Sequence, residues 1–222
     1  AFLLGVIIIS NQFVNAEDQI FNPELLPQEA SYHFVWEKAG KNIGDTTFSV
    51  KKTQDGTFLI KTTGLENTSV LVNDQNLKPI KAFRKIELGG QEFSVSGDFK
   101  NNVVNVKAKT PEGAQNVTVD IPDNTYHNDS LLMSVMAMEM DKKKKISFKH
   151  YNPANSYVGD YSVSVIGEEK VTVPAGTFDT FHLKLDYLNG KSIHDAWYEK
   201  SVPHKLVKYI NKDAGTIGRL SK

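Results

Sequence analysis

Apolar and polar residues alternate along most of the chain, and a period of two is typical of β-strands with one buried face. Near the start, Tyr32, Phe34 and Trp36 fall on one side of an extended chain, while Ser31 and His33 fall on the other. Similar runs follow at short intervals, which is typical of an all-β sheet, sandwich or barrel. The further strands predicted in this way cover residues 45–50, 57–63, 78–88, 91–99, 102–109, 116–121, 146–151, 157–168, 170–173, 177–188, 191–199 and 205–211.

Turn-forming pairs separate many of these runs. Asp55-Gly56 and Asn189-Gly190 are dipeptides that favour two-residue hairpins. A symmetric hairpin at Asn189-Gly190 sets Trp197 opposite His182 on the neighbouring strand. The turns therefore predict antiparallel pairing as well as strand positions.

One segment departs from the alternation. Residues Asn128 to Met140 read NDSLLMSVMAMEM and contain all four methionines of the protein. At 3.6 residues per turn its apolar residues cover most of the circumference, so the segment predicts a buried helix. We therefore expect a mainly β fold, in which a curved antiparallel sheet or half-barrel carries one central covering helix.

The length fits a single domain, because all-β folds commonly run to ~200 to 250 residues as one unit. We expect this β-rich domain to cover residues 31–222. An extended lead-in, residues 17–30, precedes it and carries Pro23 and Pro27.

Residues 1–16 differ from the rest of the chain. They open with AFLLGVIII, a run of nine apolar residues, which is shorter than the ~20 residues that span a bilayer. Val14 and Ala16 supply the small residues that a signal peptidase reads before Glu17. We expect a signal peptide that is incomplete at its start, since no basic segment precedes the apolar run; an apolar strand or anchor helix is the alternative. The expected location is the periplasm, with no stable membrane span after cleavage.

Composition excludes several functional classes. The 26 basic and 26 acidic residues cancel, which argues against nucleic acid as a partner, because phosphate neutralisation needs a basic face. The chain has no cysteine, so thiolate catalysis, sulfur-ligated metals and lipid attachment through cysteine are excluded. Gly40 and Gly44 lie between strands without the following helix that a phosphate loop needs. No cofactor is predicted.

Histidines and serines do not form a recognisable catalytic or metal motif. None of the six histidines belongs to an HxH or HExxH pattern, and Asp195 follows His194 directly, so in a strand the two point to opposite faces. The chain has no GxSxG motif, and Ser130 beside Asp129 suits helix capping better than nucleophilic attack. No catalytic residue and no metal site is predicted.

The methionine-rich segment is the strongest candidate for a binding surface. Methionine adapts to irregular apolar shapes, so this segment suits a pocket for acyl chains; plain core packing is the alternative. If the sheet curls over the helix, inward aromatic residues line the same pocket. The residues predicted to form it are Leu132, Met133, Met136, Met140, Phe34, Trp36, Phe181 and Trp197.

The segment from Val171 to Ile210, VTVPAGTFDTFHLKLDYLNGKSIHDAWYEKSVPHKLVKYI, resembles the closing half of the exported bacterial family known as TapB-like, a DUF3108-like domain of unknown function. The stretches YHFVWEKAGKNIGDTTFSV, NLKPIKAF and DSLL agree with it in order and spacing. The resemblance implies a periplasmic antiparallel β protein, similar in outline to the lipoprotein-carrier fold, with an apolar cavity under a helical lid. It brings no catalytic residues.

From these observations we expect a non-catalytic exported protein that binds a lipid or another apolar ligand in the bacterial cell envelope. One alternative is a structural or adaptor protein of the envelope with a dry core, which meets a protein partner through an apolar edge. A second alternative is a hydrolase, which needs a cleft with converging polar groups. Such an enzyme would lose its activity on replacement of His182 or His194 by alanine.

Overall fold

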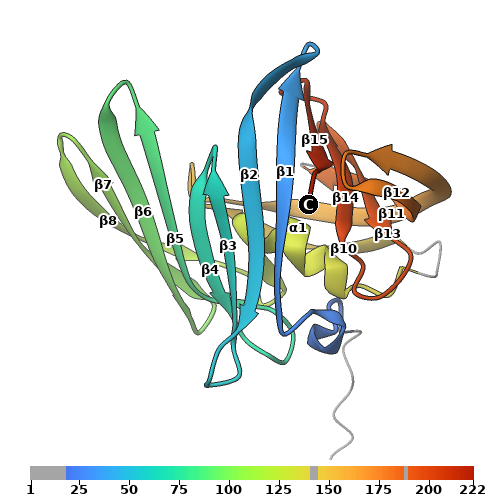
Figure 1. Ribbon diagram of the computed structural model, residues 1–222. Coiled ribbons are helices and arrows are strands. Elements are labelled where there is room, and N and C mark those ends of the chain that lie inside the picture. Colours follow the sequence, from blue (N-terminus) through green and yellow to red (C-terminus); the bar gives the residue numbers. More distant parts are fainter. Residues whose placement is uncertain (1–18, 141–144, 188–189) are drawn as a thin grey trace, which may run out of the picture.

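The first and last strands of the described chain lie side by side in the middle of one large curved sheet (Figure 1). The computed structural model describes residues 19–140, 145–187 and 190–222. The predicted signal peptide, residues 1–16, lies outside the described residues. Within them, fifteen strands form a sheet in the order β8-β7-β6-β5-β4-β3-β2-β1-β15-β14-β13-β12-β11-β10-β9.

Neighbouring strands are antiparallel, except that β9 and β10 run parallel. We call β1–β8 the N-terminal wing and β9–β15 the C-terminal wing; the sheet stays open between β8 and β9. The predicted mainly β, curved antiparallel fold is confirmed. The strands are β1 Glu29–Lys38, β2 Lys41–Lys52, β3 Phe58–Gly64, β4 Asn67–Val72, β5 Pro79–Leu88, β6 Gln91–Lys100, β7 Val103–Thr110, β8 Gly113–Asp120, β9 Thr125–His127, β10 Lys145–Asn152, β11 Tyr157–Val173, β12 Gly176–Tyr187, β13 Ser192–Glu199, β14 Leu206–Asn211 and β15 Thr216–Leu220.

The predicted register between β12 and β13 is confirmed, since His182 of β12 pairs with Trp197 of β13. Asn189 of the predicted two-residue turn lies outside the described residues. Three strands were not predicted: β4, β9 and β15. The two strands expected at 157–168 and 170–173 are one continuous strand, β11, with a register shift between Val165 and Gly167.

The predicted helix is shorter than expected and lies on the concave side of the sheet, between the wings (Figure 1). It consists of η2 (Asn128–Ser130), α1 (Leu131–Ser134) and η3 (Val135–Ala137), which together we call the helical segment. The prediction of one helix through Met140 was wrong, because Met138 is already extended, with φ −89° and ψ 146°. The carbonyl of Ala137 accepts a hydrogen bond from the backbone N–H of Asn22, at 2.7 Å, which ties the lead-in to the end of this segment.

The expected capping by Ser130 was also wrong. Its side chain makes no capping bond, and its hydroxyl instead donates to the carbonyl oxygen of His127 at 2.9 Å. The His127 ring acts in its place, because Nδ1 accepts from the backbone N–H of Asp129 at 3.2 Å. The first turn therefore depends on a histidine.

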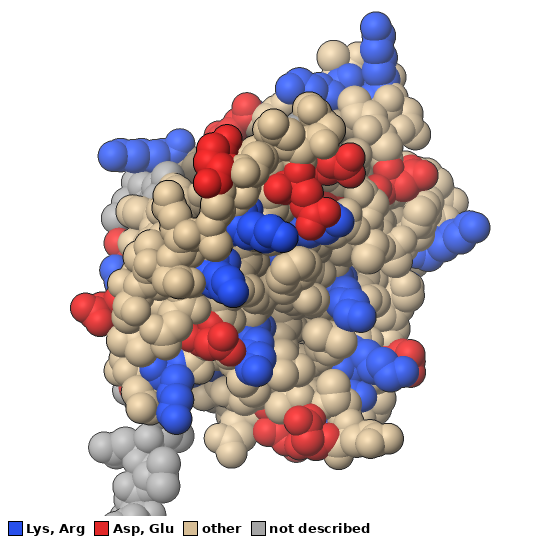
Figure 2. All heavy atoms as spheres, turned by 90° about the vertical axis from the view of Figure 1, so that its left-hand side faces the viewer, with Lys and Arg blue, Asp and Glu red and all other residues tan. Residues whose placement is uncertain are grey.

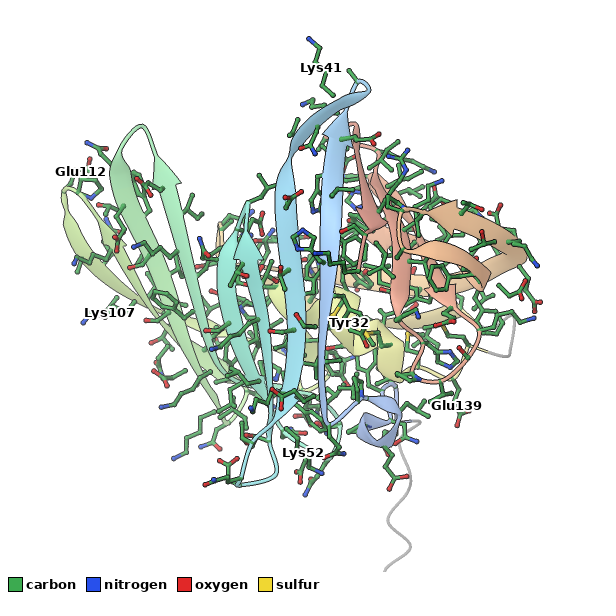
Figure 3. All side chains as sticks on the ribbon, viewed as in Figure 1. Tyr32, Lys41, Lys52, Lys107, Glu112 and Glu139 are labelled. Carbon is green, nitrogen blue, oxygen red and sulfur yellow. The ribbon has the colours of Figure 1, made fainter. Side chains whose placement is uncertain are left out.

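The helical segment is buried by contacts with both wings. All four methionines are at most 2% exposed. The Tyr198 hydroxyl of β13 donates to the carbonyl oxygen of Leu132 at 2.9 Å, and Tyr32 of β1 points toward the segment in Figure 3. A short 3-10 turn, η1 (Pro23–Leu25), follows Phe21, which is fully buried against Tyr126 and Phe148. The predicted lead-in thus contributes to the core.

Acid destabilises this arrangement through His127. Burial, with the nearby Arg84 guanidinium as a smaller contribution, lowers the pKa of His127 from 6.5 to about 3. Since the unfolded chain binds this proton at an ordinary histidine pKa, the folded state loses stability as the pH falls from about 6.5 toward about 3, by about 1.4 kcal/mol per pH unit.

The wild type loses unfolding free energy between about pH 7.5 and about pH 5. We expect this loss to be about 2 kcal/mol smaller in His127→Phe, as measured by urea denaturation at the two pH values. Burial raises the pKa of Asp129; its protonation favours the folded state in acid, but this contribution is common to both proteins and cancels in the comparison. His204→Phe, at a buried histidine elsewhere, is the comparison variant for the loss of an imidazole. Parallel profiles for wild type and His127→Phe would contradict the assignment.

Candidate functional site

A cleft of about 530 Å³ opens on the concave side of the sheet, next to the helical segment. Its volume lies within the range of ~300 to 1,000 Å³ typical of small-molecule sites. Residues of both wings and of η2 and α1 border it, so it forms only when the two halves of the chain come together.

The N-terminal wing changes from apolar to polar along its inward face. Val50, Ile60 and Val70 pair in one row across β2, β3 and β4 and are at most 1% exposed. The next inward row, two residues further along each strand, consists of Phe48, Thr62, Thr68 and Arg84, paired across β2 to β5. The first row belongs to the core and the second row borders the cleft.

This change from apolar to polar residues shows at which end of the strands the core lies and at which end the cleft lies. Lys52 and Lys41 mark the two ends of β2 in Figure 3. Because Val50 lies near Lys52, whereas Thr46 and Ile43 lie nearer to Lys41, the core occupies the Lys52 end and the cleft the Lys41 end.

Trp36 of β1 borders the cleft where the two wings meet. It lies between Gly44 of β2 and Gly218 of β15 in the paired strands. A Cβ atom on Gly218 would come within 2.9 Å of the indole ring, which is closer than real Cβ contacts, so glycine is needed there. The Trp36 ring packs edge-on against Tyr209 of β14, with 6.1 Å between ring centroids.

The helical segment contributes two apolar side chains to the cleft, Leu132 and Met133. At the rim, Ile43 is 42% exposed and Leu65 is 49% exposed. Large apolar side chains exposed beside a cavity are typical of a surface that meets an apolar molecule.

The wall from the C-terminal wing is polar and aromatic. His194 is 6% exposed, and its Nδ1 is hydrogen-bonded to the hydroxyl of Tyr209. Its Nε2 contacts Ser192 Oγ at 3.1 Å and Asp213 Oδ2 at 3.2 Å. A carboxylate only accepts hydrogen bonds, so Nε2 carries the proton and Nδ1 accepts from Tyr209. Burial raises the pKa of Tyr209 well above 10, which keeps its hydroxyl protonated as this donor.

This arrangement differs from that of a nucleophilic serine. A general base must present an unprotonated nitrogen to the serine hydroxyl, whereas His194 turns its protonated Nε2 toward Ser192. The Ser192 hydroxyl instead donates to Asp213. The three side chains form a structural hydrogen-bond network at the edge of the cleft.

His150 of β10 borders the cleft with both ring nitrogens unpaired. The residue is 3% exposed, and neither nitrogen has a hydrogen-bond partner among the described residues. Burial lowers its pKa, with Asp160 opposing the shift, so the ring is neutral near pH 7. A neutral imidazole offers one donor and one acceptor.

Arg84 and two carboxylates lie on the opposite side of the cleft. Arg84 Nη2 contacts Glu66 Oε2 at 2.6 Å, and Arg84 Nε lies 3.7 Å from Asp129 Oδ2. Burial raises the pKa of Asp129, and Arg84 opposes the shift. The charge of the guanidinium is therefore balanced by two protein carboxylates, although Arg84 Nε and Asp129 Oδ2 are too far apart for a hydrogen bond.

The structure separates the eight residues of the predicted pocket. Trp36, Leu132 and Met133 border the cleft. Phe34, Phe181, Met136 and Met140 belong to the core cluster and do not border the cleft. Trp197 belongs to the same core cluster and does not border the cleft. Because the neighbouring Tyr198 faces the helical segment, Trp197 points to the convex face, where its ring stacks on His182 at 4.3 Å and Nε1 donates to Glu169 at 2.6 Å. Whether any of these residues binds a ligand stays a prediction.

Sequence reasoning did not identify Arg84, Asp129 or His150 as site residues. A usable signal was present in the inward threonines, since Thr62 and Thr68 occupy positions where the alternation of β3 and β4 otherwise places apolar side chains. Polar residues that share the core-facing side of adjacent strands indicate a place where the core ends.

Metal and membrane features give two further observations. In the described ranges, no group of three or more His, Asp or Glu side chains has the arrangement to hold a metal ion. None of the helices there has the length and apolarity to cross a bilayer. Figure 2 shows basic and acidic side chains interspersed over the face of the N-terminal wing, in keeping with the formal net charge of zero.

Comparison with known proteins adds a family. A family model described as "Protein of unknown function (DUF3108)" matches residues 29–217. Among solved structures, the chain is similar to a "putative exported protein with YmcC-like fold" from Bacteroides fragilis, with a TM-score of 0.34 and 13% identity, over 92% of this chain and 98% of that one. No curated protein matches the chain.

Proposed function

The chain belongs to the DUF3108 family of proteins of unknown function, and we propose that it is an exported, non-catalytic protein that binds the apolar part of an amphiphile in the cleft between its two wings. The observation that carries the proposal is the cleft itself, about 530 Å³ in volume, with Trp36 and Leu132 on its walls and the exposed Ile43 and Leu65 at its rim.

Burial of the hydrocarbon part would supply the affinity. Each methylene removed from water contributes ~0.8 kcal/mol, and Trp36, Phe48 and Met133 provide apolar contact area. The polar wall around His194 would face the other end of the ligand. The exposed apolar rim offers access without unfolding of the core.

The cleft favours binding over the two alternatives. An adaptor with a dry core does not need a polar-lined cavity, whereas this cavity joins residues from eleven strands and the helical segment. A hydrolase needs an activated nucleophile, and the protonation pattern at His194 does not supply one through Ser192.

Export to the periplasm, in the bacterial cell envelope, is part of the same proposal. It is supported by the apolar run from Ala1 to Ile9 and the small residues before Glu17. A carrier or sensor of envelope amphiphiles in that compartment fits a protein whose accessible site is apolar at its rim. Its protein partner, if it delivers the ligand, would meet the same rim.

The two tryptophans allow a direct test. Trp197→Phe leaves Trp36 as the single fluorophore, and Trp36→Phe leaves Trp197 on the convex face. We expect a dodecyl amphiphile, added below its micelle-forming concentration, to shift the emission of the Trp36 protein and leave that of the Trp197 protein unchanged. Titration calorimetry on the wild type supplies the dissociation constant. Absence of heat and of any shift with several head groups would contradict the proposal.

A further inference from the structure

Several side chains that border the cleft carry a buried polar atom without a hydrogen-bond partner among the described residues. Buried and unpaired among the described residues are Trp36 Nε1, Arg84 Nε, Asp129 Oδ2 and both ring nitrogens of His150. The 3.7 Å between Arg84 Nε and Asp129 Oδ2 exceeds hydrogen-bond distance. Because a buried polar group without a partner costs ~1 to 3 kcal/mol, such a concentration points to a ligand that pairs with these atoms.

These atoms are a mixture of donors and acceptors. The indole N–H of Trp36 and the Nε–H of Arg84 donate, and Asp129 Oδ2 accepts when ionised. Neutral His150 adds one donor and one acceptor. A phosphate or carboxylate head group only accepts and an ammonium group only donates, whereas a hydroxyl group does both. The set therefore matches hydroxyl groups.

The charges of the cleft lead to the same conclusion. Arg84 is the single cation among the described residues that border it, and Glu66 and Asp129 already contact this guanidinium. An anionic head group would have to displace a carboxylate. A cationic head group would find Glu66 occupied by Arg84 and Asp129 with a pKa raised by burial, which disfavours its charged form.

The side chains also suit a ring-shaped polar group. Trp36, Tyr157, Tyr187 and Tyr209 border the cleft with flat amphipathic rings, which give contact area to the C–H faces of a sugar while their polar atoms meet hydroxyl groups. Thr62 and Thr68 add hydroxyls in the adjoining row.

We propose that the polar part of the cleft, which includes His150, binds an uncharged, hydroxyl-rich head group such as a glycosyl unit. This inference rests on the proposed function, because the head group is held next to the hydrocarbon chain in the same cleft. It deepens that function by naming the ligand class as a neutral glycolipid-like amphiphile.

Three amphiphiles with one chain and different heads test both proposals separately. The probes are n-dodecyl β-D-glucoside, dodecyl phosphate and dodecyltrimethylammonium, each below its micelle-forming concentration. The emission shift of Trp36 in Trp197→Phe and calorimetry on the wild type report binding. We expect the glucoside to bind at least about tenfold more tightly than the two charged probes, the ratio expected of one or two additional hydrogen bonds.

Variants at His150 locate the preference. His150→Phe keeps a ring of similar shape and removes both nitrogens, so we expect the glucoside to lose about three- to tenfold in affinity. The charged probes should change by less than about twofold. His150→Gln, which restores a donor and an acceptor, is expected to recover part of the loss. His204→Phe, at a buried histidine bonded to the carbonyl oxygen of Glu199 at 3.0 Å and outside the cleft, should bind all probes as the wild type does.

The outcomes distinguish the two proposals. If all three probes bind with equal affinity, or dodecyl phosphate binds most tightly, the head-group assignment is overturned and the cleft still binds amphiphiles. If none binds, the proposed function fails, and the head-group assignment fails with it. If His150→Phe does not fold by circular dichroism, the ranking of the probes on the wild type and on His150→Gln decides the assignment.

Discussion

Met136→Lys is expected to unfold the protein or bring it close to unfolding. Met136 is fully buried in the same core cluster as Leu131 and Met133. The variant would therefore place a charged ammonium group among apolar side chains. An unpaired buried charge costs several kcal/mol. We expect a loss of at least about 3 kcal/mol from a total stability of about 5–15 kcal/mol. Urea denaturation followed by circular dichroism measures it.

Two companion variants give this result its meaning. Met136→Leu conserves volume and apolarity, so it should cost less than about 1.5 kcal/mol. Leu132 lies one turn away from Met136, borders the cleft and is partly exposed. In Leu132→Lys the lysine can therefore extend toward solvent. This variant should fold and lose amphiphile binding. A stable Met136→Lys that only fails to bind would show that this side chain faces the ligand after all.

Leu220→Asp is expected to have an effect of similar size through the sheet. Leu220 is 2% exposed and pairs with Phe34, so it lies where the first and last strands join. Its carboxylate would be buried between the wings, and the pairing of β1 with β15 is the contact that makes the sheet continuous. We expect a loss of about 3 to 5 kcal/mol and a shallower denaturation profile.

Val117→Asp is the matched control at the edge of the sheet. Val117 lies on the outermost strand, β8, and is 48% exposed, so the same side chain should change stability by no more than about 0.5 kcal/mol there. Equal losses at the two positions would mean that the junction of β1 and β15 carries no special share of the stability.

The strands were predictable because local chemistry determines them. Alternation predicted most of the strands, and the Asn189-Gly190 dipeptide in the sequence predicted the observed pairing of His182 with Trp197, because a two-residue turn allows one symmetric register. The strand β15 was missed because five residues with Gly218 at their centre show little alternation. Its hydrogen-bonded neighbours lie far away in the sequence, and no local rule reports them.

The helical segment shows a different limit. Met136 and Met138 are both buried, although the first is helical and the second extended. When packing surrounds a segment on all sides, apolar residues continue past the end of the helix and no glycine or proline marks it. Composition therefore predicted that this segment is buried, but not where its helix ends.

The cleft could be predicted only in part. The apolar members Trp36, Leu132 and Met133 are predictable from the sequence, because large or adaptable apolar side chains suit an apolar pocket. The polar members came together through tertiary structure: Arg84 from β5 and His150 from β10 are 66 positions apart, on different wings. A single sequence does not report which inward polar residues face one another across a curved sheet.

The junction of β1 and β15 also determines when this protein can fold. The Ser221 hydroxyl bonds to the carbonyl oxygen of His33 across 188 positions of sequence. Contacts of such separation are slow to form, because the loop-closure entropy must be overcome first. During synthesis the N-terminal wing is therefore made while its central edge is still unpaired, and the sheet is complete only after β15 has been made and has paired with β1. We therefore expect refolding on a scale of ~milliseconds to seconds, as is typical of folds dominated by contacts between distant residues.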